Sequence, residues 1–137
     1  MTDDTRNEAA SGSPDQEVEI PTGEWQSFLN GFSLKHDKWI ANVEVLGANG
    51  ERDVEVRERP FSGISYDEPG TGETRIYIDL SAEEPGNSLE HSVINPTRVA
   101  LLGPNSDDIA IKSSDGSTTI VRFVRASDPG KPSDVAA

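Results

Sequence analysis

The sequence predicts a mainly β (α+β) domain, with one N-terminal amphipathic helix packed on a curled antiparallel sheet or small barrel of roughly six to eight strands. Apolar residues recur at every second position in several segments between Trp39 and Arg125, which is the period of a strand with one buried face. Turn-forming residues separate these segments. A single segment with the helical period precedes them all.

The chain of 137 residues divides into three parts by composition. Residues 1–22 carry a net charge of −5 and residues 126–137 a net charge of −1, and both contain few large apolar side chains. Such segments bury too little apolar surface to offset their ordering entropy. We therefore expect a disordered acidic arm (1–22), one globular β-rich domain (23–125) and a disordered C-terminal tail (126–137). Disorder is expected from Met1 to Glu19 and from Asp128 to Ala137.

The total charge of −13 leaves −7 on the expected domain, which would repel nucleic acid. The chain has no cysteine, so a disulfide or a thiolate metal site is excluded. No apolar run approaches the roughly 18 residues that span a bilayer, and the acidic N-terminus is unlike a signal peptide. We expect a cytoplasmic protein with no membrane contact and no cofactor. A salt-rich cytoplasm would also fit the acidity.

The helix is expected to begin after Pro21, with Thr22 capping free amides and Glu24 favouring the positive end of the helix dipole. Its apolar residues fall at i, i+3, i+4 and i+7, and they are Trp25, Phe28, Leu29 and Phe32. That spacing forms one stripe, whose commonest use is to cover a sheet. His36 is expected to cap the carbonyl end of the helix.

The expected strands are residues 39–46, 53–59, 61–67, 73–80, 89–94, 98–102, 109–112 and 118–125. Val54 and Val56 are expected to point inward. Pro60 lacks an amide donor and should mark a strand end or an edge. Side chains and turns expected to be structural are Trp25, Phe28, Phe32, Trp39, Gly63, Pro96 and Gly116.

Two glycines have specific expected roles. Phe61 and Ile64 differ in parity, so a bulge or bend at Gly63 is needed for both to reach the core. In the last hairpin, a three-residue loop ending in left-handed Gly116 places Ile109 and Ile111 on the face of Val121 and Phe123. A two-residue Asp-Gly loop would split this apolar group, so we predict the longer loop.

His91 is the candidate catalytic residue. It shares strand parity with Leu89 and Val93, and a buried, hydrogen-bonded histidine is its commoner role. As an acid or base it would work beside Glu90 or Asp79. Candidate ligand-binding or partner-binding residues, on the assumption that they are exposed and adjacent across strands, are Tyr66, Arg75, Tyr77 and Arg98. The spacing of His and carboxylate residues predicts no metal site.

Several segments resemble an uncharacterised family of small bacterial domains of unknown function over about residues 24–124. They are Trp25-x-x-Phe28, Pro60-Phe61-x-Gly63-Ile64-x-Tyr66-Asp67, Leu89-x-His91-x-Val93-x-x-Pro96 and Asp115-Gly116-x-x-Thr119-Ile120-Val121-Arg122-Phe123. The resemblance implies a small single domain and assigns no catalytic residues. Because one motif includes His91, the resemblance gives a functional role of His91 more weight.

Three function classes remain open. The first is a non-enzymatic binding or regulatory module that uses a sheet face, a sheet edge or the loops 68–72 and 83–87, with a protein partner. The second is a small hydrolase- or isomerase-type enzyme with His91 as acid or base. The third is a small-barrel RNA binder, which would need a basic groove built from Arg57, Arg59, Arg98 and Arg122. The acidic arm is a further candidate contact for a basic partner.

Overall fold

The computed structural model describes residues 17–68, 72–82, 84, 86–103 and 107–124. The elements, in chain order, are β1 (Glu17–Ile20), the 3-10 helix η1 (Thr22–Glu24), α1 (Trp25–His36), β2 (Ile40–Leu46), β3 (Arg52–Asp67), β4 (Arg75–Ser81), β5 (Ser88–Ile94), β6 (Pro96–Leu102), β7 (Asp108–Ser113) and β8 (Thr118–Phe123). Residues 1–16 of the expected arm (1–22), and the whole expected tail (126–137), lie outside the described residues.

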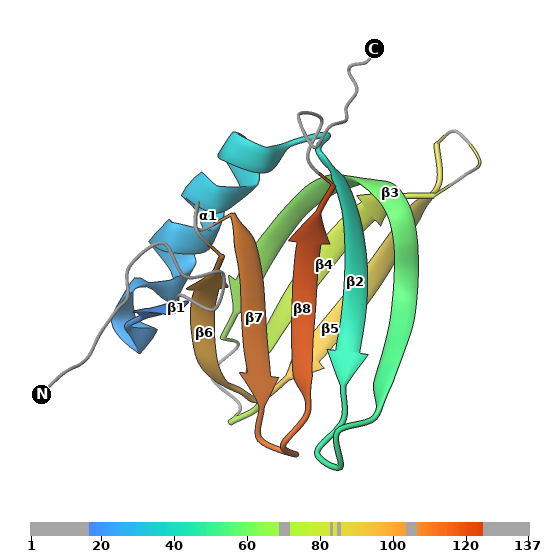
Figure 1. Ribbon diagram of the computed structural model, residues 1–137. Coiled ribbons are helices and arrows are strands. Elements are labelled where there is room, and N and C mark those ends of the chain that lie inside the picture. Colours follow the sequence, from blue (N-terminus) through green and yellow to red (C-terminus); the bar gives the residue numbers. More distant parts are fainter. Residues whose placement is uncertain (1–16, 69–71, 83, 85, 104–106, 125–137) are drawn as a thin grey trace, which may run out of the picture.

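All eight strands join one antiparallel sheet in the order β1-β6-β7-β8-β2-β3-β4-β5. The sheet curls so that β4 and β5 lie behind β7, β8 and β2, while α1 lies along one side (Figure 1). Because β1 and β5 end the strand order, the sheet is not closed into a barrel. The predicted helix on a curled antiparallel sheet is therefore confirmed.

The long strand β3 links the two layers of the curled sheet. Its first half pairs with β2 as far as Pro60, and its second half pairs with β4 from Phe61 onward. The register shifts between Phe61 and Gly63, and both Phe61 and Ile64 are buried. The predicted bulge is thus confirmed. The two strands expected on either side of Pro60 are one strand, because the proline falls where the pairing partner changes.

Helix α1 covers the edge of β3 that β2 leaves free. The Ser33 hydroxyl accepts a hydrogen bond from the Ile64 amide at 2.8 Å, and it lies 2.9 Å from the Ile64 carbonyl oxygen. A side chain on the helix therefore satisfies the backbone groups that a neighbouring strand would otherwise pair. The predicted stripe is buried at Trp25, Leu29 and Phe32, and Phe28 is half-buried against the core.

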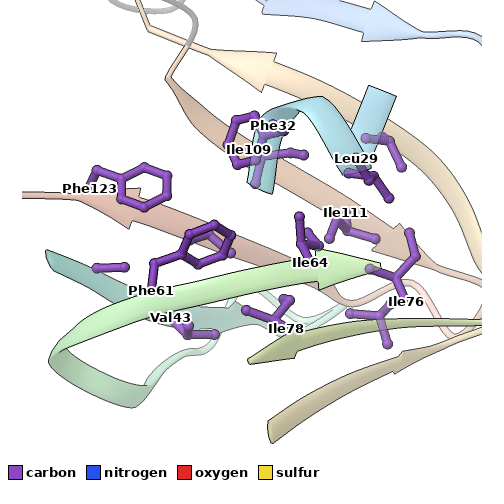
Figure 2. Packing of buried hydrophobic residues seen from close by; sticks show 14 of the residues in the cluster. Leu29, Phe32, Val43, Phe61, Ile64, Ile76, Ile78, Ile109, Ile111 and Phe123 are labelled. Atoms are coloured by element: carbon purple, nitrogen blue, oxygen red, sulfur yellow. The ribbon is translucent and has the colours of Figure 1, made fainter. Parts of the chain in front are cut away.

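The core fills the space between the two layers and α1. Leu29, Phe32, Val43, Phe61, Ile64, Ile76, Ile78, Ile109, Ile111 and Phe123 converge there (Figure 2). The Phe61 ring meets the Phe123 ring edge-on, with centroids 5.2 Å apart. Each such side chain contributes roughly 1.5–3 kcal/mol of transfer free energy, so the helix is held mainly by its apolar face.

The chain passes from one layer to the other at Asn95, between β5 and β6. Asn95 has a φ of 51°. Its amide donates to the Thr74 carbonyl oxygen at 2.7 Å, and its carbonyl oxygen accepts from the Ser114 amide at 3.0 Å. Buried Pro96 then begins β6. Because it is the first residue of the strand, its lack of an N–H donor removes no hydrogen bond from the sheet.

The N-terminal boundary differs from the expectation. Glu17–Ile20 form β1 against β6, Ile20 is buried, and the Trp25 indole donates to the Ile20 carbonyl oxygen at 3.0 Å. The ordered chain therefore begins before Gly23, because Val18 and Ile20 have strand alternation inside an acidic segment. Thr22 makes no capping bond, since a 3-10 turn precedes the helix.

The last hairpin has the predicted loop. Ile111 pairs with Thr119 and Ile109 with Val121, and Gly116 has a φ of 93°. A two-residue loop would have paired Ile111 with Ile120, so the three-residue loop is confirmed.

Substituting Gly63 tests how closely the helix approaches β3. A Cβ atom at Gly63 would lie 3.6 Å from Ser33 Oγ and 3.8 Å from Ser33 Cβ. One added carbon therefore fits, whereas the branched methyl groups of valine would push Ser33 away from Ile64. We expect Gly63→Val to lower the free energy of unfolding by about 1–3 kcal/mol, measured by urea denaturation. Gly63→Ala is the matched control, and equal stability of the valine variant and the parent would contradict the expectation.

Candidate functional site

His91 lies on the inner face of β5, opposite Ile78 of β4. Its Nε2 atom is 3.4 Å from the Thr119 hydroxyl on β8. Burial lowers the pKa of His91 below its ordinary value of 6.5, and the carboxylate of Glu55 opposes this effect in part. The imidazole is therefore a neutral, partly buried group between the two layers at neutral pH.

Glu90 and Asp79 do not face His91. Strand alternation places Glu90 on the opposite face of β5 from His91, and Asp79 pairs directly with Glu90 on that outer face. Burial raises the pKa of Asp79, and the neighbouring Glu90 carboxylate raises it further. The structure therefore brings the two carboxyl groups together and separates both from the imidazole.

The four candidate binding residues lie at three separate places. Tyr66 is half-buried on the inner face of β3, edge-on to Trp25 with a centroid distance of 5.3 Å. Arg75 and Tyr77 are on the outer face of β4, where Arg75 pairs with Glu73 at 3.0 Å. Arg98 is on β6 and contacts Glu17 and Glu19 of β1. Their spacing along the chain does not bring them together, because they belong to opposite faces and distant strands.

The arginines invoked for an RNA-binding groove also lie apart. Arg59 donates to the carbonyl oxygens of Ser81 at 2.9 Å and Ala82 at 2.6 Å. Arg122 lies 3.4 Å from Glu44 on β2, while Arg98 contacts β1. Three of the four guanidinium groups thus have acceptors on different elements.

The sequence reasoning missed a buried polar pair at the end of α1. His36 is 1% exposed. Its Nδ1 donates to the Phe32 carbonyl oxygen at 2.8 Å, as predicted for a helix cap, and its Nε2 lies 2.9 Å from Asp107 Oδ1 just before β7. The signal was present, because residues 25, 29, 32 and 36 continue the helical stripe.

The imidazole of His36 is enclosed by aromatic rings. Its centroid lies 4.1 Å from Phe32, 4.5 Å from Trp39 and 4.7 Å from Phe123, with the last ring stacked at 16°. Because Nδ1 faces a carbonyl oxygen and Nε2 faces a carboxyl group, both nitrogens are engaged within the protein. The pair fastens α1 to β7 and leaves neither nitrogen available to a substrate.

A groove of about 440 Å³ lies next to this pair, between α1 and β6. Its lining residues are Ser27, Phe28, Gly31, Phe32, Lys35, His36 and Leu101. The Lys35 ammonium lies 3.4 Å from Asp107 Oδ1, so its charge is already balanced. The groove is an apolar surface without a free charged anchor.

Among the described residues, four strand edges have no neighbouring strand: the outer edges of β1 and β5, and one edge of each half of β3. Three of these four edges are protected. The β1 edge is short, at four residues, and includes Glu17 and Glu19. Helix α1 covers the second half of β3. The first half of β3 is protected by register shifts opposite β2, by a left-handed Glu58 and by frequent charges. Short length, bulges and charge are the usual protections of an edge.

The register shift between Val43 and Glu44 explains why Val54 is 41% exposed, against the expectation that it points inward.

The β5 edge has the fewest of these protections: apart from the single charge of Glu90, it is neither short nor bulged. It spans seven residues, contains no proline or lysine, and shows no register shift against β4. Leu89 is 38% exposed and Ile94 is 43% exposed. In the part of the chain that the structure describes, only the Ile94 carbonyl oxygen on this side has a partner, the Ser113 hydroxyl at 2.7 Å.

The direction of the unpaired backbone groups follows from the two bonds at the end of β5. The Asn95 amide points toward Thr74, beside β4, whereas the Ile94 carbonyl oxygen points the other way, toward Ser113. Backbone groups of successive residues alternate between the two sides of a strand. The amide and carbonyl groups of Glu90 and Ser92 therefore face the open edge.

Among the described residues, no group of three or more His, Asp or Glu side chains could hold a metal ion. No described helix is long and apolar enough to cross a membrane.

Comparison with known proteins identifies a family but no activity. Residues 16–132 match the family described as "Family of unknown function (DUF5335)", and the chain belongs to it. The expected membership in a family of unknown function is thereby confirmed. No solved structure matches this chain.

Removal of Asp107 tests how firmly the buried pair holds α1. Asp107→Ala leaves the enclosed Nε2 of His36 without a partner, and we expect a loss of about 1–3 kcal/mol in the free energy of unfolding, measured by chemical denaturation. The control is Lys35→Met, which removes an exposed partner of the same carboxylate and should cost less than about 1 kcal/mol. Equal losses in the two variants would show that the buried contact of Asp107 with His36 stabilises the fold no more than its exposed contact with Lys35.

The environment of His91 predicts a pH dependence of stability. Its pKa in the folded protein lies below that of the unfolded chain, so unfolding takes up a proton as the pH falls. His91 thus contributes stability above its unfolded pKa of about 6.5, and this contribution is lost on acidification. The stability of His91→Gln should fall less than that of the parent between pH 7 and pH 5, measured by thermal unfolding at several pH values. Parallel pH profiles would contradict the expectation.

Proposed function

We propose that this member of DUF5335 is a non-enzymatic binding module that accepts an extended segment of a partner protein along β5. The observation that carries the proposal is the β5 edge, which is regular along its seven residues and carries only one charged side chain. Backbone groups on such an edge can pair with an added strand, which is a common mode of peptide recognition. The other edges that lack a strand neighbour are protected, so the proposal designates a single strand.

The environments of the two histidines support a binding role over catalysis. Both nitrogens of His36 are engaged within the core. For His91, the only described hydrogen-bond partner is the Thr119 hydroxyl, and no described carboxylate lies within hydrogen-bond distance of its ring. An acid–base mechanism needs a group positioned beside the imidazole to orient it or exchange protons with it. Among the described residues, we find no observation that favours the hydrolase or isomerase hypothesis.

The geometry of β5 sets the strength expected of the complex. A strand added beside residues 88–93 would pair with backbone groups of Glu90 and Ser92 that face outward. Each new hydrogen bond contributes roughly 0.5–1.5 kcal/mol net, and exposed Leu89 adds apolar contact. Because ordering the partner segment opposes binding, we expect an affinity in the micromolar range for a single segment of about seven residues.

A proline at position 92 should abolish strand addition. Ser92→Pro removes an amide that faces the open edge, while the amides that bond to β4 remain, so the strand should persist as proline-bearing edge strands do. Heptapeptides selected from a random displayed library against the full chain are the probes. We expect their affinity for Ser92→Pro to fall at least about tenfold, or about 1.4 kcal/mol, measured by calorimetry.

The matched control is Ser92→Ala, which loses the hydroxyl and keeps the amide, and it should bind as the parent does. Bound peptide should also slow the amide exchange of Glu90 and Ser92. The proposal fails if the selected peptides bind Ser92→Pro as tightly as the parent. It also fails if protection appears at Phe28 and Leu101 instead, which would assign binding to the groove.

A further inference from the structure

We infer that the strand accepted by β5 is basic and alternating, with lysine or arginine on its outer face and apolar residues on its inner face. This inference rests on the proposed function and names the chemistry of its partner. It depends on two rows of side chains that approach the open edge, one on each face of the sheet.

The outer row is acidic. Gly63, Asp79 and Glu90 lie opposite one another across β3, β4 and β5. Gly63 contributes no side chain, so the row consists of two carboxyl groups, the second of them on the edge strand itself. An added strand would place its own outward side chain directly beside Glu90, because neighbouring strands align side chains on the same face.

These two carboxyl groups have no cation of their own among the described residues. Nearby Arg75 is paired with Glu73, and Arg59 is bonded to backbone carbonyl groups. Burial is the main cause of the raised pKa of Asp79, and the Glu90 carboxylate beside it raises this pKa further, so the two groups disfavour each other's charge. A lysine or arginine on the added strand would relieve this repulsion. The net charge of −13 would also attract a basic segment from a distance.

The inner row is mainly apolar. Leu89, His91 and Val93 alternate with the outward residues of β5, and Val93 is buried. The side chains of an added strand on this face would lie beside exposed Leu89 and the neutral His91 imidazole. Apolar residues suit that position because they would cover Leu89 without burying a charge. The two rows together specify a sequence of alternating basic and apolar residues.

A second copy of the chain fits this edge poorly. Antiparallel pairing of β5 with itself would bring two outer rows of Asp79 and Glu90 to the same interface. Each copy also carries a net charge of −13, so the two molecules repel each other at long range. Charge complementarity therefore favours a basic segment of another protein over self-association.

The test uses three acetylated, amidated heptapeptides and the full chain at low ionic strength. One peptide alternates valine and lysine, the second alternates valine and glutamate, and the third is the lysine peptide with every internal backbone nitrogen methylated. We expect the lysine peptide to bind at least about tenfold more tightly than the glutamate peptide, and the methylated peptide to bind weakly because it cannot pair with the edge. Affinities are measured by calorimetry, at two salt concentrations.

Two variants of equal charge change locate the effect. Glu90→Gln should reduce the preference for lysine over glutamate at least about threefold. Glu24→Gln, at the start of α1, removes the same charge far from β5 and should leave the preference unchanged. Equal effects of the two variants would mean that overall charge, and not the outer row, selects the peptide, which would overturn the inference.

The remaining outcomes separate the inference from the proposed function. Equal binding of the lysine and glutamate peptides, with both lost in Ser92→Pro, would overturn the basic partner and keep the edge as a binding surface. Full binding of the methylated peptide, or of the lysine peptide to Ser92→Pro, would overturn both. A dimer in sedimentation experiments that Ser92→Pro dissociates would replace the basic partner by a second copy.

Discussion

The bend in β3 is the constraint that the rest of the structure depends on. One strand must pair with β2 in the front layer and with β4 in the back layer, so it has to change partner along its length. Pro60 and the bulge before Gly63 make this change while keeping Phe61 and Ile64 in the same core. Because of this change, β3 lacks a neighbouring strand on one side of its first half and on the other side of its second half. Helix α1 covers one of these exposed halves through Ser33, and charges and irregular register protect the other.

The position of α1 follows from this constraint. A helix that closes the side of a curled sheet must be fixed at more than one point, because an apolar stripe alone permits sliding. Trp25 is bonded to Ile20 at one end, while Ser33 is bonded to Ile64 and His36 to Asp107 in the last turn. Each fixed point joins the helix to a different strand or to the segment beside one. The polar contacts therefore set the position of a helix whose stability comes from its apolar face.

The features that sequence predicted are those that depend on neighbouring residues. The helical stripe, the hairpin loop at Gly116 and the bulge at Gly63 each follow from periodicity within a short segment. The buried pair of His36 and Asp107 joins residues 71 positions apart, so only the histidine half had a local signal. The alternation of Val18 and Ile20 did not lead to a prediction of β1, because the acidic composition of the whole arm indicates disorder. The open edge of β5 depends on strand order, which no local pattern specifies.

The strand order also has a consequence for the time course of folding. Strands β3, β4 and β5 are consecutive hairpins, so they can form as soon as residues up to Ile94 are available. Strand β1 must wait for β6, and β2 pairs with β8, as in the contact of Ala41 with Phe123. Contacts between such distant segments slow folding, because a long loop has to close before they form. During this interval β2, β3, β4 and β5 can pair as consecutive hairpins without β1, β6, β7 and β8, and the acidity of the chain opposes association of the incomplete molecules.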